Sequence, residues 1–413
     1  MFLTTGWTKK IVVLLALLTL LSAAFAQGST VRSALRPDAP AYGVRGPNWV
    51  GTRDLIIEGA APLPITVWYP AQNPEQLEES TVYPYVLKMD TPPGTVATVT
   101  GHALSDAPYA IAERPYPLVI LSSGFALGRT AYAWQAEHLA SHGYVVIAPE
   151  HDERFDPSMT TFWPADIKRP QDTLTVLTYV DQQVAAGGAF EGLIDAQLVA
   201  VIGHSSGGST ALAAAGARLD TDNLKVHCDA VKAAADPSAW LCDLALPFVT
   251  DMAALAGLEE VPQGLWPTTR DDRIDAVVSM AGEGFKFGAA GLAEVSVPVM
   301  VMSGTLDTGS PYSWGAALTY DNVASTKKAM VSFENAEHMI FGTSCEDLPI
   351  YAAFGMYQLC SDHIWDMDRA HDLINHFTTA FLASVLNDDA AAAAALAPGS
   401  FSIAGVDYQA LGY

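Results

Sequence analysis

Apolar positions in the middle of the chain follow two alternating patterns. Continuous apolar runs without polar alternation occupy residues 116–124, 144–152 and 196–205. Residues 130–143 and 169–185 instead repeat apolar positions with the period of a helix. Strands that lack polar alternation are typical of a parallel sheet covered by helices on both faces. The pattern therefore predicts an α/β fold with a mostly parallel central sheet.

The sequence before this region predicts fewer regular elements. Residues 27–50 are rich in Pro, Gly and Arg and indicate an irregular lead-in. Residues 53–59 and 63–70 alternate β-branched and aromatic residues between turn formers, which predicts two strands joined by a short turn. Pro and Gly recur through residues 71–114, so we expect loops with little regular structure there.

The C-terminal part resumes the strand and helix pattern. Three further strands are predicted at residues 274–282, 297–307 and 328–338, and a long closing helix at 364–387. These elements extend the sheet and complete one large domain over residues 27–388.

Two segments depart from this pattern. Residues 217–272 contain two cysteines, two tryptophans and several prolines, and we expect an insertion or cap over the sheet edge. Residues 389–413 begin with an alanine-rich run of low complexity, and we expect a poorly ordered tail.

The N-terminus has the pattern of an export signal over residues 1–26. Lys9 and Lys10 precede the apolar run 11–21, and Ala24-Phe25-Ala26 has the A-x-A form of a cleavage site. The run is short for a membrane span, although a retained anchor is the alternative. We expect a secreted or periplasmic protein that begins near Gln27 and keeps no stable membrane anchor after cleavage.

The formal net charge of the chain is −24, from 45 acidic and 21 basic residues. Such a surface repels phosphate backbones and therefore excludes nucleic acid as an expected partner. Neutral and cationic small molecules or lipid esters remain possible substrates. The oligomeric state is not indicated by the sequence.

Four cysteines lie beyond the expected signal, and four cysteines allow three pairings. The simplest choice is two local bridges, Cys228–Cys242 and Cys345–Cys360. Each would close a loop of roughly 15 residues, which contributes about 3 kcal/mol in the entropy model. Four buried thiols are the alternative, which an oxidising compartment disfavours.

Candidate chemistry is concentrated at the turn after the run 196–205. Gly203-His204-Ser205-Ser206-Gly207 follows this run and opens an alanine-rich helix. A serine hydroxyl is a poor nucleophile unless it is exposed beside a base, and a sharp strand-to-helix turn provides that exposure. Gly203 and Gly207 remove side chains that would clash in this G-x-S-x-G nucleophile elbow. A tight helix-start turn without chemistry is the alternative.

The base and its orienting acid should follow in the order serine, acid, histidine. Asp307 ends one predicted strand and His338 ends the next. Ser205, Asp307 and His338 are thus expected at the C-terminal edge of the sheet, where open α/β sheets place their sites. Glu334 and Glu337 are alternative acids, but they share the strand end of the histidine.

Other histidines are alternatives for the base or for a metal site. Three of them lie near or on the closing helix, and we expect surface or packing roles for these: His363, His371 and His376. His151 follows a strand and is a candidate for lining the pocket, whereas the side chain of His204 should point away from the serine. We expect no metal ion.

Attack by serine creates an oxyanion that needs two hydrogen-bond donors. We expect one from the backbone N–H of Ser206 and the other from the loop 122–129, where the N–H of Phe125 after Gly124 is the candidate. Losing one such donor costs about 2.7–4 kcal/mol of barrier. An ordinary glycine turn is the alternative for this loop.

These motifs resemble a known group. The segment LSSGFALGRTAYAWQAEHLASHGYVVIAPEHDE, followed by RPQD and GHSSGG, resembles the platelet-activating factor acetylhydrolase-like serine hydrolases. That group merges with the dienelactone hydrolase-like and cutinase-like polyester hydrolases. The resemblance covers about residues 53–216 and 274–345. It implies an α/β-hydrolase fold with a catalytic domain over residues 27–388, and cofactor-free hydrolysis of esters with short or truncated acyl groups.

The resemblance also assigns roles to individual positions. The nucleophile, acid, base and two oxyanion donors correspond to Ser205, Asp307, His338, Phe125 and Ser206. Ser123-Gly124 stands where the platelet-activating factor enzymes usually carry His-Gly. Dienelactone hydrolases proper carry cysteine at the position of Ser205, which argues against that activity.

The residues of the substrate pocket are less well indicated. Phe125, Trp134 and Trp163 are candidates for its apolar wall, with core packing as the alternative for the two tryptophans. The sequence thus predicts an exported serine esterase for short or truncated acyl esters, including platelet-activating factor-like phospholipids. A cutinase-like polyester hydrolase is the alternative. A non-catalytic binding module on a hydrolase fold is the alternative of another class, although such modules usually lose one member of the triad.

Overall fold

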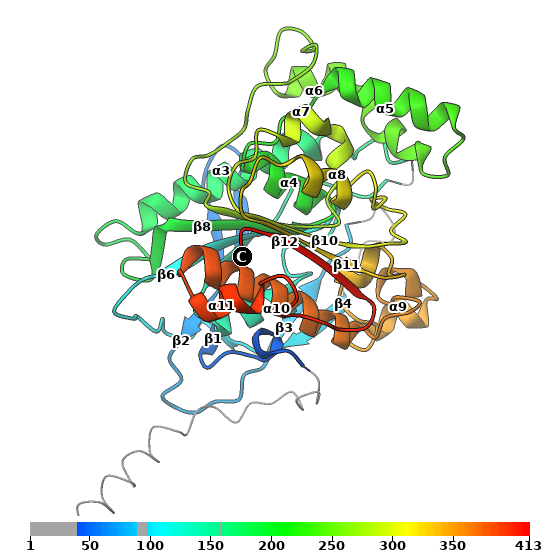
Figure 1. Cartoon of the computed structure of the whole chain (residues 1–413). Helices are drawn as coiled ribbons and strands as arrows, with labels where there is room; N and C mark the ends of the chain where they lie inside the picture. The colour runs from blue at the N-terminus through cyan, green and yellow to red at the C-terminus, as the bar shows by residue number, and fades with distance from the viewer. Residues whose placement is uncertain (1–38, 89–96, 157) are drawn as a thin grey trace, which may run out of the picture. The chain divides into compact units, whose positions relative to one another are not determined.

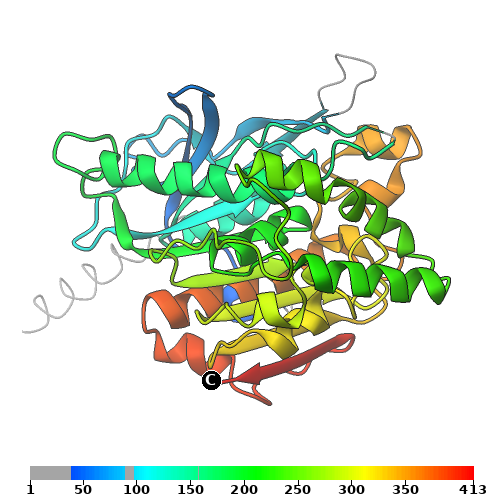
Figure 2. The same ribbon diagram turned by 90° about the horizontal axis from the view of Figure 1, so that it is seen from above.

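The central feature of the molecule is a ten-stranded sheet. The computed structural model describes residues 39–88, 97–156 and 158–413, so the predicted export signal lies outside the described residues. Across the sheet the strands are β12 (Val406–Leu411), β11 (Lys328–Phe333), β10 (Val299–Gly304), β9 (Ala276–Met280), β8 (Ile194–His204), β6 (Tyr116–Ser122), β7 (Val145–Pro149), β2 (Leu63–Ala71), β1 (Trp49–Ile57) and β5 (Leu104–Ser105). Figure 2 shows red β12 at one edge and the blue N-terminal strands toward the other.

The middle of this sheet is parallel, as the sequence predicts. β7, β6, β8, β9, β10 and β11 pair in parallel, while β2 and β12 join antiparallel at either side. Apart from the first part of β8, nearly every residue of these parallel strands is buried, because both faces of the sheet are covered. This burial explains why their sequences lack polar alternation.

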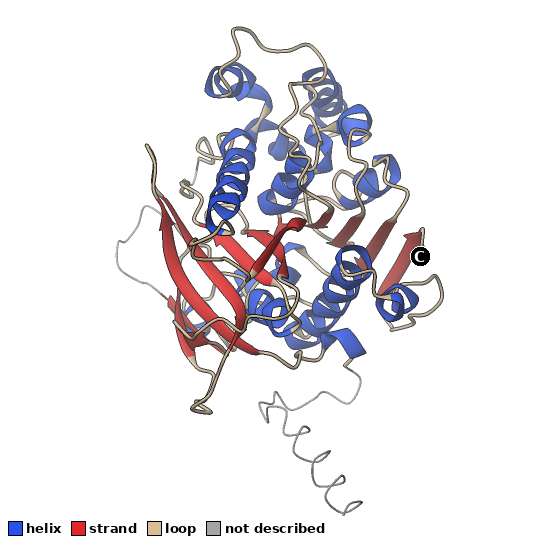
Figure 3. Ribbon diagram, turned by 90° about the vertical axis from the view of Figure 1, so that its left-hand side faces the viewer, coloured by secondary structure: helices blue, strands red, loops and turns tan. Residues whose placement is uncertain are grey.

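Helices cover the two faces of the sheet (Figures 1 and 3). One face carries α3 (Ala165–Gln183), α4 (Ser206–Ala214), α7 (Gly288–Leu292) and α8 (Ala316–Asn322), and the other carries α2 (Ala133–Ser141), α10 (Met367–Leu386) and α11 (Ala390–Ala395). Each face has its own apolar core. On α10, for example, Phe377 and Phe381 are fully buried, each contributing about 1.5–3 kcal/mol. Within the described ranges, none of the helices is both long and apolar enough to span a membrane.

The remaining helices lie in loops that follow the strands, except for the 3₁₀ turn at Ala41–Gly43, which precedes β1. They are α5 (Thr221–Ala233), α6 (Val249–Leu255) and α9 (Pro349–Ala353), together with 3₁₀ turns at Ala41–Gly43, Ala239–Leu244, Leu246–Phe248, Gly284–Lys286, His338–Phe341 and Tyr357–Leu359. α5 and α6 belong to the segment 217–272 that the sequence sets apart.

The segment 71–114 is more regular than predicted. β3 (Thr81–Tyr85) and β4 (Ala97–Gly101) form a separate two-stranded antiparallel sheet. Buried Tyr83 anchors it, because its hydroxyl accepts from Trp68 Nε1 at 2.9 Å and lies 2.8 Å from Glu137 Oε1. These tertiary contacts outweigh the local preference of Pro and Gly for loops.

The expectation of a poorly ordered tail at residues 389–413 is wrong. Asp389 caps α11 by accepting the N–H groups of Ala391 and Ala392, and β12 then pairs with all six residues of β11. An unpaired edge of β11 would leave backbone donors and acceptors exposed, and β12 satisfies them. The alanine-rich segment therefore completes the sheet.

Candidate active site

Ser205 occupies a strained turn between β8 and α4. Its φ of 58° and ψ of −123° lie outside the regions that non-glycine residues prefer. A Cβ on Gly203 would lie 2.5 Å from the backbone of Gly207, and one on Gly207 would lie 2.0 Å from the carbonyl oxygen of Ser122. The turn therefore closes against β6 only with glycine at both positions.

Ser205, His338 and Asp307 form one chain of contacts across three loops. His338 Nε2 lies 2.9 Å from Ser205 Oγ, and His338 Nδ1 lies 2.9 and 2.8 Å from the two carboxylate oxygens of Asp307. The Asp307 side chain is fully buried and accepts the backbone N–H of Ser310 at 2.6 Å. Asp307 follows β10 and His338 follows β11, so the C-terminal ends of neighbouring strands bring the groups together.

Electrostatics around His338 favour its protonated form. Burial by itself lowers the pKa of the imidazole. The negative charge and hydrogen bond of Asp307, together with the charge of Glu283, overcome this effect and raise the pKa of His338 above its ordinary value of 6.5. The arrangement can therefore stabilise the imidazolium that forms when the neutral ring takes a proton from Ser205.

The alternative residues lie in other environments. Glu337 Oε1 lies 3.6 Å from Nδ1 of the exposed His363 ring. His371 stacks on Trp134 with ring centroids 3.8 Å apart and bonds to the carbonyl of Gly342, while His376 stacks on Phe401. The packing roles predicted for His371 and His376 agree with these contacts.

His204 lies beside the candidate base and also lines the cavity that contains Ser205. Its Nε2 donates to the backbone carbonyl of His338 at 3.0 Å, and its Nδ1 accepts from the hydroxyl of Tyr132 at 2.6 Å. Burial holds the pKa of His204 well below its usual value, so the ring is neutral. His204 thus fixes the backbone that carries the His338 imidazole, a contact that sequence reasoning missed.

His151, a candidate for the pocket wall, does not line this cavity. Its Nε2 lies 2.9 Å from Ser122 Oγ and its Nδ1 lies 2.7 Å from Asp172 Oδ2. This second serine–histidine–carboxylate chain is closed off, because the Ser122 side chain is buried at the end of β6. The structure uses it to join β6 to α3.

Another histidine pair was overlooked in the sequence. His138 and His142 of α2 have the i, i+4 spacing that can hold a metal ion. Their Nε2 atoms instead contact the backbone carbonyls of Tyr42 and Val44, each at 2.9 Å. The pair therefore attaches the N-terminal lead-in to α2.

The two candidate oxyanion donors flank the nucleophile. Ser206 is the first residue of α4, and the first N–H groups of a helix have no partner within it. In the other loop, the N–H of Ala126 donates to Glu153 and that of Leu127 to Gly124, while the N–H of Phe125 has no partner among the described residues. Phe125 lines the same cavity as Ser205.

A cavity of ≈ 390 Å³ opens at Ser205 and His338. Its wall is mostly apolar, with Phe155, Phe162 and Trp240 among its aromatic side chains and Glu283 and Gln358 among its polar ones.

The prediction that Trp134 and Trp163 line the pocket is wrong, because neither side chain borders this cavity. Trp134 packs in the core beneath α2, against the His371 ring, and Trp163 stacks on Phe248 between α3 and α6. Both tryptophans therefore have packing positions away from the wall.

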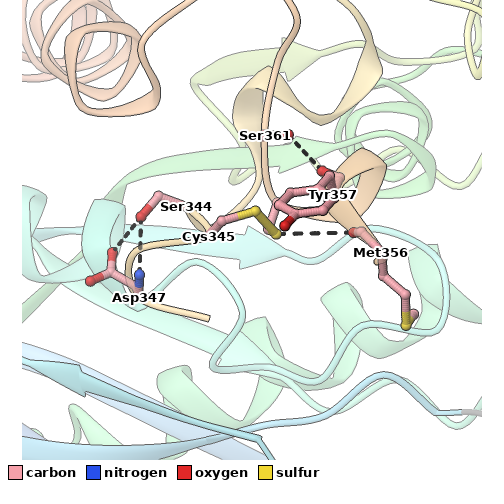
Figure 4. Close-up of a disulfide and its surroundings, with 7 residues drawn as sticks. Ser344, Cys345, Asp347, Met356, Tyr357 and Ser361 are labelled. Carbon is pink, nitrogen blue, oxygen red and sulfur yellow. Dashed lines mark hydrogen bonds between the residues drawn. A yellow bond between two sulfur atoms is a disulfide. The ribbon is translucent and has the colours of Figure 1, made fainter. Parts of the chain in front are cut away.

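Both predicted disulfides are present and brace the cavity. Cys228–Cys242 closes a loop that supplies Trp240 and Leu241 to the wall. Cys345–Cys360 closes the loop that supplies Met356, Gln358 and Leu359, and Figure 4 shows Met356 beside this bridge. Each bridge spans 14 or 15 residues, so each contributes about 3 kcal/mol in the entropy model.

Comparisons with known proteins agree with this architecture. The family described as Chlorophyllase matches residues 107–241. Cutinase est1 of Thermobifida alba is 23% identical over 245 residues, which is 59% of this chain and 60% of that protein. Cutinase est2 of the same organism is 32% identical over 27% of this chain and 34% of that protein. Chlorophyllase-1 of Arabidopsis thaliana is 28% identical over 24% and 29%, respectively.

These matches cover less than two thirds of the length of the curated relatives. A solved structure gives wider coverage: ferulic acid esterase from Streptomyces cinnamoneus matches 90% of this chain and 98% of its own, with a TM-score of 0.54 and 20% identity. The architecture is thus an α/β-hydrolase fold. The relatives that share parts of this sequence are named as two cutinases and a chlorophyllase.

Proposed function

We propose that this protein is an exported serine hydrolase of carboxylic esters. The observation that carries the proposal is the chain of contacts from Ser205 through His338 to the buried Asp307, at the base of an apolar cavity. A hydroxyl, an imidazole and a carboxylate in this order form the arrangement that activates serine for acyl transfer.

In the proposed reaction His338 Nε2 takes the proton of Ser205 as Oγ attacks the ester carbonyl carbon. The N–H groups of Phe125 and Ser206 donate to the resulting oxyanion. The imidazolium, held by Asp307, returns the proton to the departing alcohol as the ester bond breaks. Water then attacks the acyl carbon while the neutral His338 Nε2 takes one of its protons. His338 gives that proton to Ser205 Oγ as the bond between Oγ and the acyl carbon breaks and the acid leaves.

The substrate class follows from the cavity and the resemblances. The apolar wall suits an acyl or aryl group, and the volume of ≈ 390 Å³ suits a short or truncated one. Truncated phospholipids of the platelet-activating factor type are one candidate. The matches to two proteins named as cutinases favour a second candidate, a polyester. A polymeric polyester would be met outside the cell, and the two disulfides support export.

A panel of esters and an active-site label test the proposal. We expect purified protein to hydrolyse p-nitrophenyl acetate and butyrate faster than the palmitate ester, because a short acyl group is enclosed more completely. A fluorophosphonate should modify one residue, and peptide mass analysis should locate it at Ser205. Acid release from truncated phospholipid and from polyester film separates the two candidates. Absence of both hydrolysis and labelling would indicate a non-catalytic binding module.

The pH dependence of activity should follow His338. Because the base must be neutral and its pKa is raised above 6.5, we expect kcat/KM to fall as the pH drops through a midpoint above 6.5. Glu283→Gln removes one charge that raises this pKa, so the midpoint should move to lower pH. A pH profile with a neutral ester measures it. The exposed Glu294→Gln is the control, and a wild-type midpoint below 6.5 would contradict the expectation.

A further inference from the structure

A buried ion pair lies under the turn that carries Phe125. Arg169 of α3 donates from Nε to Glu153 Oε2 at 3.0 Å and forms a second, shorter bond to Oε1. The side chains of Arg169 and Glu153 are only 1% and 7% exposed. A pair this deeply buried is stabilising only when its other donors and acceptors are also satisfied.

The backbone of the turn satisfies these groups. The Arg169 guanidinium donates to the carbonyls of Ser123 and Gly124, the latter at 3.1 Å. Glu153 Oε1 accepts the N–H of Ala126 at 2.7 Å. The ion pair therefore holds the chain immediately before and immediately after Phe125.

The contact between Arg169 and the Gly124 carbonyl also fixes the direction of the Phe125 N–H. The carbonyl of Gly124 and the N–H of Phe125 belong to the same planar trans peptide, so they point in opposite directions. Arg169 holds the carbonyl, which leaves the N–H directed away from the ion pair. Gly124 and Phe125 line the cavity with Ser205, whereas Arg169 and Glu153 do not.

We propose that Arg169 and Glu153 are positioning residues that aim the Phe125 N–H at the oxyanion formed on the substrate carbonyl. This inference rests on the proposed esterase function, in which that N–H is an oxyanion donor. The ion pair acts through the peptide between Gly124 and Phe125 and does not touch substrate. Its effect therefore falls on the transition state and not on substrate binding.

Three variants test the inference. Only one of them, Glu153→Gln alone, leaves a buried charge without its partner in the pair. Arg169→Lys keeps the charge but loses the planar fork that reaches two carbonyls and a carboxylate together. The double variant Arg169→Met with Glu153→Gln removes both charges and keeps an acceptor for the Ala126 N–H. Glu153→Gln alone is the third. As a matched control, Arg273→Met with Asp271→Asn removes an ion pair that does not border the cavity.

Activity is measured per site that a fluorophosphonate titrates, so unfolded protein is not counted. We expect kcat to fall about 10-fold in Arg169→Lys and about 100-fold in the double variant, with KM within about twofold, because a misaimed donor is partly lost. An arylboronic acid places an oxygen in the oxyanion position when Ser205 Oγ bonds to boron. The affinity of the variants for this acid should therefore fall by the same factors. The control should keep wild-type kcat and boronate affinity.

Several outcomes would overturn the inference. One is wild-type kcat and boronate affinity, within about threefold, in Arg169→Lys and the double variant. Another is a higher KM at unchanged kcat. A third is the absence of titratable sites in all three variants, which would make the pair an element of folding alone. A wild-type protein that hydrolyses no ester would instead refute the proposed function, and the two failures are thereby distinguished.

Discussion

Ser205→Ala is expected to lower kcat for p-nitrophenyl butyrate by about 10⁶-fold, since removal of the proposed nucleophile abolishes the acyl-enzyme route. The residual rate should reflect the oxyanion donors and substrate binding alone. The fold should persist, because alanine removes only the hydroxyl and its 2.9 Å contact with His338. That contact contributes about 1 kcal/mol to the free energy of unfolding.

The experiment compares kcat, fluorophosphonate labelling and thermal unfolding of the wild type and the variant. Ser384→Ala is the matched control, because this buried serine of α10 donates to the carbonyl of Phe381 in the same helix and does not line the cavity. The control should keep wild-type kcat within about twofold. Labelling or hydrolysis that persists at more than about one per cent in Ser205→Ala would show that another residue is the nucleophile.

Asp307→Asn is expected to lower kcat by about 10⁴-fold while leaving the fold intact. The backbone N–H of Ser310 donates to Asp307 Oδ1 at 2.6 Å, so an asparagine should place its oxygen there and turn its amide nitrogen toward His338 Nδ1. That nitrogen can only donate. The imidazole would then carry its proton on Nε2, where it cannot accept the proton of Ser205.

A kinetic and pH analysis of this variant separates its effects. The loss should fall on kcat, and the acidic midpoint of the residual activity should move to lower pH, because the carboxylate that raises the pKa of His338 is gone. Asp366→Asn is the control. Asp366 caps α10 by accepting the N–H of Arg369, and asparagine caps a helix about equally well. An Asp307→Asn variant with kcat within tenfold of wild type would refute the orienting role.

The strands and helices predicted for the parallel sheet occur in the structure because each has a strong local pattern in the sequence. The apolar run 196–205 corresponds to β8, and the following alanine-rich helix corresponds to α4. β12 had no such signal, since its sequence alternates half-buried and exposed residues at an edge. Only pairing with β11 makes it a strand.

Part of the candidate site could likewise be predicted from the sequence, and part could not. The order of Ser205, Asp307 and His338 along the chain, each following an apolar run, suffices to propose them together, because the C-terminal ends of parallel strands meet at one edge. The cavity wall was not predictable. Trp134 and Trp163 are aromatic residues near the site in sequence, yet both pack elsewhere.

The sequence by itself determined the parallel sheet and the serine turn with its two glycines, and it favoured the local cysteine pairs, because hydrophobic period, steric exclusion and short loop length all act locally. Tertiary structure alone decided the cavity wall, the edge strand β12 and the contact of Arg169 with the carbonyl of Gly124. These features join residues that lie far apart in the chain. No local sequence pattern specifies contacts between residues so far apart in the chain. These contacts exist only once the folded sheet has brought its loops together.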